Sequence, residues 1–135
     1  MRRGGLLDTN HLSDAIMPVS FVRDRLQREV GLGRGFVICI PVLCELEVGL
    51  RGLGRPEEPR QQLRSIRKYL RLWPLEGDFV DFYAEVALDA KRRGRTLSQI
   101  DIMLAALCRQ HGLTLLTSDR DFEALPDIRV ENWLA

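Results

Sequence analysis

Four acidic side chains, far apart in the sequence, are candidates for sharing one metal ion. Asp8 directly follows the first predicted strand, and Asp119 lies two residues beyond the end of a later one. Glu45 falls about one turn into the helix after the second strand, and Asp101 falls in the first turn of an apolar helix. Because ligands of parallel α/β sheets gather at the carboxyl ends of the strands, we expect the four carboxylates to converge at that edge.

Converging carboxylates imply a particular chemistry. Without a positive charge among them, they repel one another and raise one another's pKa. A hard divalent cation removes this repulsion, and Mg2+ binds in proteins through a few carboxylates together with waters and substrate phosphate. Such a site can generate hydroxide from bound water and stabilise a phosphodiester under attack. The four acids therefore predict metal-assisted phosphate chemistry, with Mg2+ as the ion and Mn2+ as the alternative.

Each acid also has an ordinary structural explanation. Asp8 can cap the helix that follows it, and Ser98 with Asp101 matches a capping box. Asp121 is expected to cap the last short helix, and Glu45 fits an exposed helix position. If all of them served only such roles, the chain would be a non-catalytic α/β module that binds RNA or protein. Metal-dependent turnover would separate that alternative from any enzyme.

The elements that must position these acids alternate between strands and helices. Apolar, β-branched runs and turn residues predict strands over 4–7, 36–40, 72–75, 114–117 and 128–133. Helical spacing and capping residues predict helices over 10–16, 19–30, 41–50, 60–72, 78–93 and 99–110, with a short helix ending at Leu125. Strands separated by helices indicate an α/β protein, with three α/β/α layers around a mainly parallel central sheet of four to five strands.

Composition limits the remaining possibilities. The length of 135 residues predicts a single domain, 1–135, and the 45% hydrophobic and 29% charged residues are typical of a soluble globular protein. No stretch approaches the ~20 apolar residues of a membrane span, and no signal-peptide pattern is present, so we predict a cytoplasmic protein. The three cysteines form no CxxC pair, which argues against a disulfide framework or a zinc site.

Several motifs resemble the signature segments of PIN-domain nucleases, and most closely those of the VapC-type toxins of bacterial toxin–antitoxin systems. The resemblance, in order and spacing, spans nearly the whole chain and rests on the segments Leu6–Asn10, Leu43–Leu46, Ile100–Ala106, Leu115–Phe122 and Val130–Trp133. It implies a compact PIN-like fold, an acidic metal pocket, cleavage of RNA, inhibition by a cognate VapB-like antitoxin, and a homodimer.

The resemblance also assigns roles to individual residues. By motif match, the catalytic and metal-binding acids would be Asp8, Glu45, Asp101 and Asp119. Thr117 matches a hydroxyl residue near the metal, and Asn10 would help to orient Asp8. Asp121 also matches a recurrent family position, although we favour its capping role.

Two departures from the family pattern affect the surroundings of the site. Gly4 and Gly5 replace bulkier residues, which predicts a weaker first strand. Ser118 stands where the family often has asparagine, so the positioning of Asp119 is expected to differ in detail. Neither departure removes a carboxylate.

Arginine dominates the basic residues, since only Lys68 and Lys91 are lysines among 20. Two basic groups are candidates for gripping an RNA backbone, although a solvated helix face is the more common meaning of such runs. These candidates are Arg64, Arg67, Lys68 and Arg71, and Arg92, Arg93 and Arg95.

Other enzyme classes fit the sequence less well. A haloacid-dehalogenase-like phosphohydrolase, the main rival, needs a second aspartate two residues after the first, where this chain has Asn10. A phospho-accepting receiver domain needs a lysine after a late strand, but the last lysine is Lys91. Metal-free cleavage of RNA by His11 and His111 would require a mutual geometry that no spacing predicts.

Overall fold

The computed structural model describes residues 3–134, so residues 1, 2 and 135 of the predicted domain lie outside the described range. Its strands are β1 (Gly5–Leu7), β2 (Phe36–Cys39), β3 (Leu70–Trp73), β4 (Thr114–Leu116) and β5 (Val130–Glu131). Its α-helices are α1 (Thr9–Ala15), α2 (Phe21–Gly31), α3 (Ile40–Arg51), α4 (Glu57–Ile66), α5 (Phe79–Arg92) and α6 (Gln99–His111). Two 3-10 helices, η1 (Arg67–Tyr69) and η2 (Arg120–Ala124), complete the fold.

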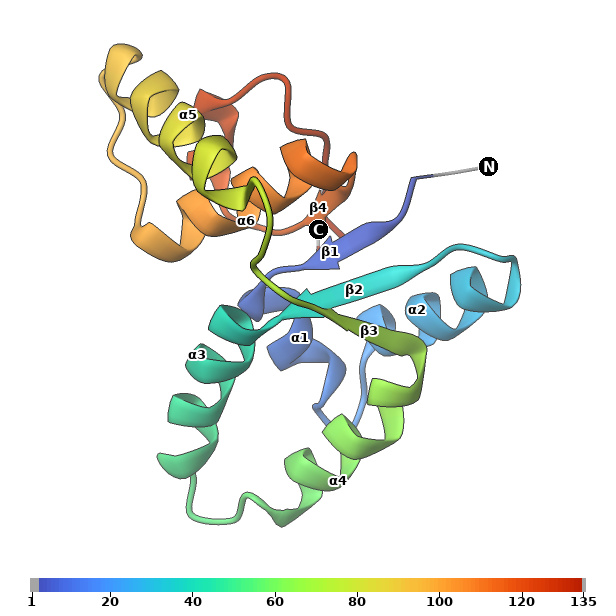
Figure 1. Ribbon diagram of the computed structural model, residues 1–135. Helices are drawn as coiled ribbons and strands as arrows, with labels where there is room; N and C mark the ends of the chain where they lie inside the picture. The colour runs from blue at the N-terminus through green and yellow to red at the C-terminus, as the bar shows by residue number, and fades with distance from the viewer. Residues whose placement is uncertain (1–2, 135) are drawn as a thin grey trace.

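The five strands form one sheet in the order β3-β2-β1-β4-β5, and every neighbouring pair is parallel. Figure 1 shows α5 and α6 on one side of the sheet and the helices α1 to α4 on the other. The predicted three-layer α/β/α architecture is therefore confirmed. Because the strands are parallel, the residues that follow β1, β2 and β4 emerge at the same edge of the sheet.

Packing at the centre of the sheet explains Gly5, one of the two glycines near the start of the chain. Gly5 pairs with Phe36 on one side and with Thr114 on the other. A Cβ atom at Gly5 would lie 2.8 Å from Cδ1 of Phe36, closer than side chains tolerate. The glycine therefore makes room for the phenylalanine ring, and β1 is a central strand paired on both sides although it begins with a glycine.

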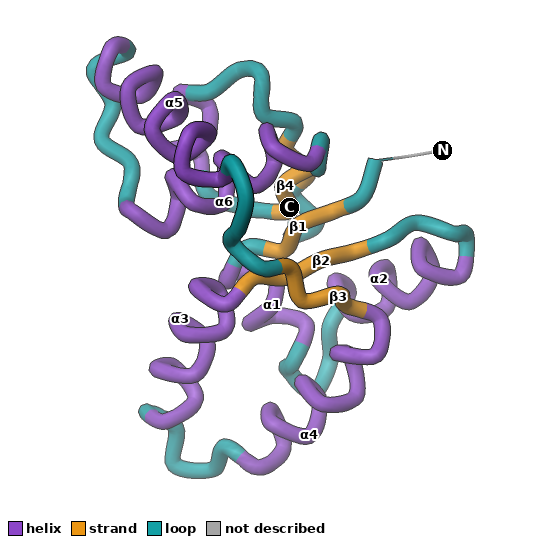
Figure 2. Tube along the Cα trace, in the orientation of Figure 1, coloured by secondary structure: helices purple, strands orange, loops and turns teal. Residues whose placement is uncertain are grey.

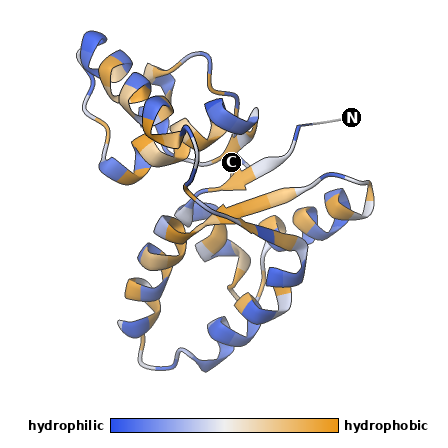
Figure 3. Ribbon diagram, viewed as in Figure 1, coloured by the Kyte–Doolittle hydropathy of each residue, from blue (hydrophilic) through white to orange (hydrophobic). Residues whose placement is uncertain are grey.

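Helix α6, which carries Asp101 in its first turn, is packed into the core. Five consecutive residues, Leu104–Cys108, are buried, as the apolar composition of this segment predicts. The helix packs against α5 and β4, and Figure 3 shows hydrophobic residues gathered on the sheet and on the helix faces turned toward it. Within residues 3–134, no helix combines the length and apolar character that crossing a membrane requires.

The segment around β3 differs from the prediction. The predicted helix 60–72 is a shorter α4 that begins at Glu57, before Pro59, followed by η1 and then by β3 (Figure 2). Leu70 continues the helical spacing of apolar residues, yet it pairs with Phe36 as the first residue of an edge strand. Pairing with β2, which is distant in sequence, overrides the local periodicity.

Candidate active site

Asp8 lies at the carboxyl end of β1 and is 6% exposed. One carboxylate oxygen accepts a hydrogen bond from the Thr9 backbone N–H at 2.7 Å, so Asp8 caps α1. The other oxygen accepts a hydrogen bond from the Thr117 hydroxyl, also at 2.7 Å. Capping and site formation are thus compatible, because each uses a different oxygen.

Thr117 joins the two strand ends that carry the acids. Its buried hydroxyl donates to Asp8, and it accepts from the Asp119 backbone N–H at 3.0 Å. It also accepts from the Asn10 amide nitrogen at 3.3 Å, and this nitrogen lies 3.4 Å from the same oxygen of Asp8. The Asn10 carbonyl oxygen accepts from the Ser118 backbone N–H at 3.3 Å. These bonds fix the segment after β4 relative to the start of α1.

Three carboxylates gather closely where the segment after β4 meets the start of α6. One oxygen each from Asp101, Asp119 and Asp121 lies within 4.8 Å of the others. The Ser98 hydroxyl accepts from the Asp101 backbone N–H at 3.1 Å, which caps α6 and holds this aspartate at the helix start. Such a group of hard oxygen donors fits a divalent cation such as Mg2+ or Mn2+.

Asp121 is the acid that the sequence analysis placed wrongly. The predicted capping role belongs to Asp119, whose carboxylate accepts from the Asp121 backbone N–H at 2.8 Å. The Asp121 side chain is therefore free of that role and joins the acidic cluster. The sequence did hold a signal for a second role of Asp121. Asp119 and Asp121 are separated by one residue, so either of them could have been the cap and the other a site residue.

Glu45 reaches the same region from α3. Its carboxylate accepts a hydrogen bond from the Thr9 hydroxyl at 2.6 Å, which places it beside the start of α1. Its charge acts on Asp8, and so does the charge of Asp119, while Asp101 responds to both of these aspartates. Among the described residues, Asp101 and Asp119 thus share the close cluster with Asp121, whereas Asp8 and Glu45 lie outside it and act on neighbouring acids through their charges.

Burial, and to a smaller extent the neighbouring negative charges, raises the pKa values of Asp8 and Asp101. Burial is the main cause that raises the pKa of Asp8, the hydrogen bonds from Thr117 and Thr9 oppose it, and the charges of Glu45 and Asp119 add to it. Burial also raises the pKa of Asp101 to about 6, opposed by its hydrogen bond with Ser98 and reinforced by Asp119 and Asp8. A bound cation would remove this cost, so the electrostatics fit a metal site.

The two histidines have structural partners instead of facing each other. His11 is fully buried, with Nδ1 2.7 Å from the Asn10 carbonyl oxygen, and its Nε2 accepts from the Trp133 backbone N–H at 2.9 Å. Burial lowers the pKa of His11 to about 4, although Asp14 opposes the shift. His11 is therefore a neutral ring whose hydrogen bond holds the Asn10 side chain in place. His111 ends α6 and packs on Trp73.

The basic candidates divide into two groups by position. Arg92, Arg93 and Arg95 are exposed and lie at the end of α5 and in the loop before α6, and Arg92 pairs with Asp89 at 3.2 Å. Arg64, Arg67, Lys68 and Arg71 are also exposed, but they lie at the end of α4, in η1 and in the first half of β3. The second group therefore belongs to the amino end of the sheet, opposite to the acids.

Comparison with known proteins agrees with this geometry. The chain belongs to the PIN domain family, which matches residues 6–128. Ribonuclease VapC4 of Mycobacterium tuberculosis is 27% identical over 121 residues, covering 88% of this chain and 93% of the relative. The resemblance to VapC-type PIN nucleases is thereby confirmed.

Solved structures support the same fold. VapBC2 from Rickettsia felis, crystallised with a DNA fragment from its promoter, superposes with a TM-score of 0.84 at 22% identity, covering 96% of this chain and 98% of that one. VapC20 of Mycobacterium tuberculosis, described as a toxin that cleaves the sarcin–ricin loop, gives 0.62 at 17% identity, with coverage of 90% and 94%.

Proposed function

We propose that this protein is a metal-dependent endoribonuclease that hydrolyses RNA phosphodiester bonds. The observation that carries the proposal is the convergence of acids from four separate segments at the carboxyl edge of a PIN-domain sheet. The similarity to ribonuclease VapC4 supports RNA as the substrate. The match to the PIN domain family argues against the haloacid-dehalogenase-like alternative. So does Asn10, which donates its amide to Asp8 and Thr117 where that alternative needs a second acid.

The residues of the chain divide the work in this proposal. Asp101, Asp119 and Asp121 would hold a Mg2+ ion together with Asp8, and Glu45 would complete the acidic set. The bound ion would supply a water of lowered pKa and neutralise charge on the attacked phosphate. Thr117 and Asn10 hold the Asp8 carboxylate at a fixed place and prevent it from turning toward solvent.

The natural partners follow from the relatives. We propose a VapB-like antitoxin as the inhibitor, because the similar Rickettsia felis structure is a VapBC complex, and a homodimer as the assembly. This makes the chain the toxin of a type II toxin–antitoxin pair. Expression alone should arrest growth, and co-expression of the cognate antitoxin should restore it. Normal growth with abundant full-length protein would contradict the toxin role and leave the nuclease proposal standing.

The nuclease proposal is tested with Asp101→Asn. The variant loses one charged ligand and keeps a residue that can occupy a helix start, so we expect cleavage of single-stranded RNA with Mg2+ to fall about a hundredfold or more. Asp81→Asn is the matched control, because Asp81 is an exposed aspartate in the first turn of α5. Circular dichroism should show both variants folded.

The RNA ends give a second measurement in the same experiment. Hydrolysis by water leaves 5'-phosphate and 3'-hydroxyl ends, and the separate structural contacts of His11 and His111 favour this route. A 2',3'-cyclic phosphate product, or full Mg2+-dependent activity in folded Asp101→Asn, would overturn the proposal.

A further inference from the structure

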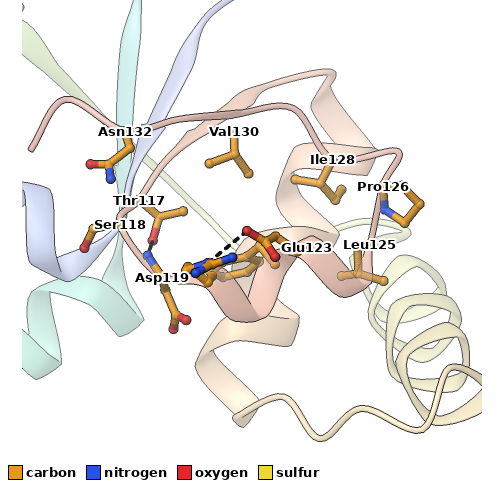
Figure 4. A pocket seen from close by; sticks show the side chains of 11 residues that line it. Thr117, Ser118, Asp119, Glu123, Leu125, Pro126, Ile128, Val130 and Asn132 are labelled. Carbon is orange, nitrogen blue, oxygen red and sulfur yellow. Dashed lines mark hydrogen bonds and ion pairs between the residues drawn. The ribbon is translucent and has the colours of Figure 1, made fainter. Parts of the chain in front are cut away.

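A pocket lies next to the acidic site. It has a volume of about 300 Å³ and lies between the segment 117–120, η2 and β5. Figure 4 shows it from close by, and we call it the β5 pocket. Thr117 and Asp119 line it and also take part in the acidic site, so the two share a wall.

The interior of the β5 pocket is apolar. Leu125 and Ile128 are buried and form part of its lining, and Phe122 is buried among them. Val130 remains 43% exposed although it is a strand residue, and Figure 4 shows its side chain directed into the hollow. These side chains offer surfaces against which the face of a planar, weakly polar ring can pack.

Two polar groups with unused hydrogen-bonding capacity stand at one end of the β5 pocket. The side-chain oxygen of Asn132 accepts from the Leu134 backbone N–H at 2.9 Å, which holds the side chain in place, and its NH2 group makes no hydrogen bond within residues 3–134. The hydroxyl of Ser118 is exposed and makes no hydrogen bond to any residue between 3 and 134. A ligand that fits must therefore carry acceptors along the edge of its ring, as every nucleobase does.

The shared wall sets where such a ring would lie relative to the chemistry. In Figure 4 the Asp119 carboxylate points away from the β5 pocket, while its backbone borders it. The acidic cluster and the pocket thus lie on the two sides of one chain segment. A nucleotide with its phosphate at the acids can pass over Ser118 and place its base in the pocket.

We propose that the β5 pocket binds the base of an unpaired nucleotide adjacent to the scissile phosphate, and that Asn132 and Ser118 select this base. The inference rests on the proposed nuclease function and adds a determinant of sequence preference. The base must be unpaired because its hydrogen-bonding edge contacts Asn132 and Ser118, which fits recognition of single-stranded loops and ends in RNA. Arg120 and Glu123, which form an exposed ion pair at 3.2 Å, also line the pocket.

Val130→Trp tests the proposal by filling the pocket. We expect kcat/KM for single-stranded RNA to fall about tenfold, the size of one lost base contact, and the preference at one position beside the cut to disappear. Val19→Trp is the control, since Val19 is 83% exposed and lies between α1 and α2. An unchanged preference in Val130→Trp would overturn the proposal.

A measurement without catalysis separates this inference from the nuclease function. In EDTA, nucleoside 5'-monophosphates should shift the amide NMR signals of Ser118, Val130 and Asn132, and ribose 5-phosphate should not. No shifts, or equal shifts with ribose 5-phosphate, would refute a base site even if RNA is cleaved. Base-dependent shifts in a wild-type protein that cuts no RNA would support the base site and refute the nuclease.

Discussion

Two clusters of charged residues in this molecule are built on opposite principles. Around Arg34, whose side chain is 4% exposed, the guanidinium donates to Glu29 at 2.8 Å and to Glu131 at 2.9 Å. Its Nε also donates to the Arg3 carbonyl oxygen at 2.8 Å, and Arg25 pairs with Glu29 at 2.7 Å. In this cluster each buried charge faces an opposite one.

The acidic site holds like charges, and no basic side chain between residues 3 and 134 forms an ion pair with them. Its acids are supported by neutral donors instead, namely the hydroxyls of Thr117 and Thr9 and backbone N–H groups. Neutral donors fix the carboxylates in place without cancelling their charge. The comparison shows how one fold reserves negative charge for a ligand while neutralising it elsewhere, and active sites commonly carry this cost in stability.

The largest expected effect comes from breaking the neutralised cluster. Arg34→Met removes the central cation and should lower the free energy of unfolding by about 3 kcal/mol or more, because buried carboxylates lose their compensating charge. Urea denaturation measures the change. Arg28→Met is the control. Arg28 is an exposed residue of α2, and its replacement should change stability by less than about 0.5 kcal/mol. Equal stability of Arg34→Met and the wild type would show that this cluster is not a source of stability.

A second prediction concerns His11, the buried ring behind the acidic site. Its pKa is about 4 in the fold, against 6.5 as the ordinary value, so the unfolded chain binds more protons between these pH values. The contribution of His11 to stability is therefore complete above pH 6.5 and is lost as the pH falls toward 4, by up to about 3 kcal/mol.

His11→Gln isolates this contribution from that of the neighbouring acids, whose raised pKa values act in the opposite direction. Glutamine keeps an acceptor for the Trp133 backbone N–H but does not titrate. We expect the stability advantage of the wild type over His11→Gln, measured by urea unfolding in EDTA, to shrink from pH 7 to pH 4.5. A constant difference would mean that His11 is not buried in its neutral form.

The sequence could predict the position of a site residue where the pattern of strands and helices around that residue fixes it. Asp8 and Asp119 follow apolar strands, and the parallel arrangement fixes where strand ends meet, so their proximity was predictable. The role of Asp121 was not, because either aspartate of the pair could cap η2, and the spacing in the sequence does not say which one does. The site roles themselves stay predictions until the variants are tested.

The fold was predictable to a similar degree. Strands and helices with strong apolar patterns appear close to their expected positions, including the buried run Leu104–Cys108 in α6. Leu70 fits helical spacing and strand pairing equally well from sequence, and its partner Phe36 is too distant for local patterns to reveal. The β5 pocket was also out of reach, because its walls come from segments whose packing depends on the whole fold.

The smallest expected effect comes from replacing one partly buried acid of the site, whose pKa is raised first by burial and then by the neighbouring negative charges. Because the pKa of Asp101 is raised to about 6, its ionised form is disfavoured in the fold, and stability falls as the pH rises from about 4 to 6. At pH 7 in EDTA, Asp101→Asn should therefore be more stable than the wild type by about 1 kcal/mol, after allowance for its partial exposure to solvent.

Thermal unfolding gives the measurement for this last variant. The gain should raise Tm by about 3 °C in EDTA, whereas Asp81→Asn should leave it unchanged. Added Mg2+ should then stabilise the wild type more than Asp101→Asn, because the ion binds the folded acids and the variant has lost one of them. If Asp101→Asn were less stable than the wild type in EDTA, the acids would be stabilising one another without a metal, and the contrast with the Arg34 cluster would be wrong.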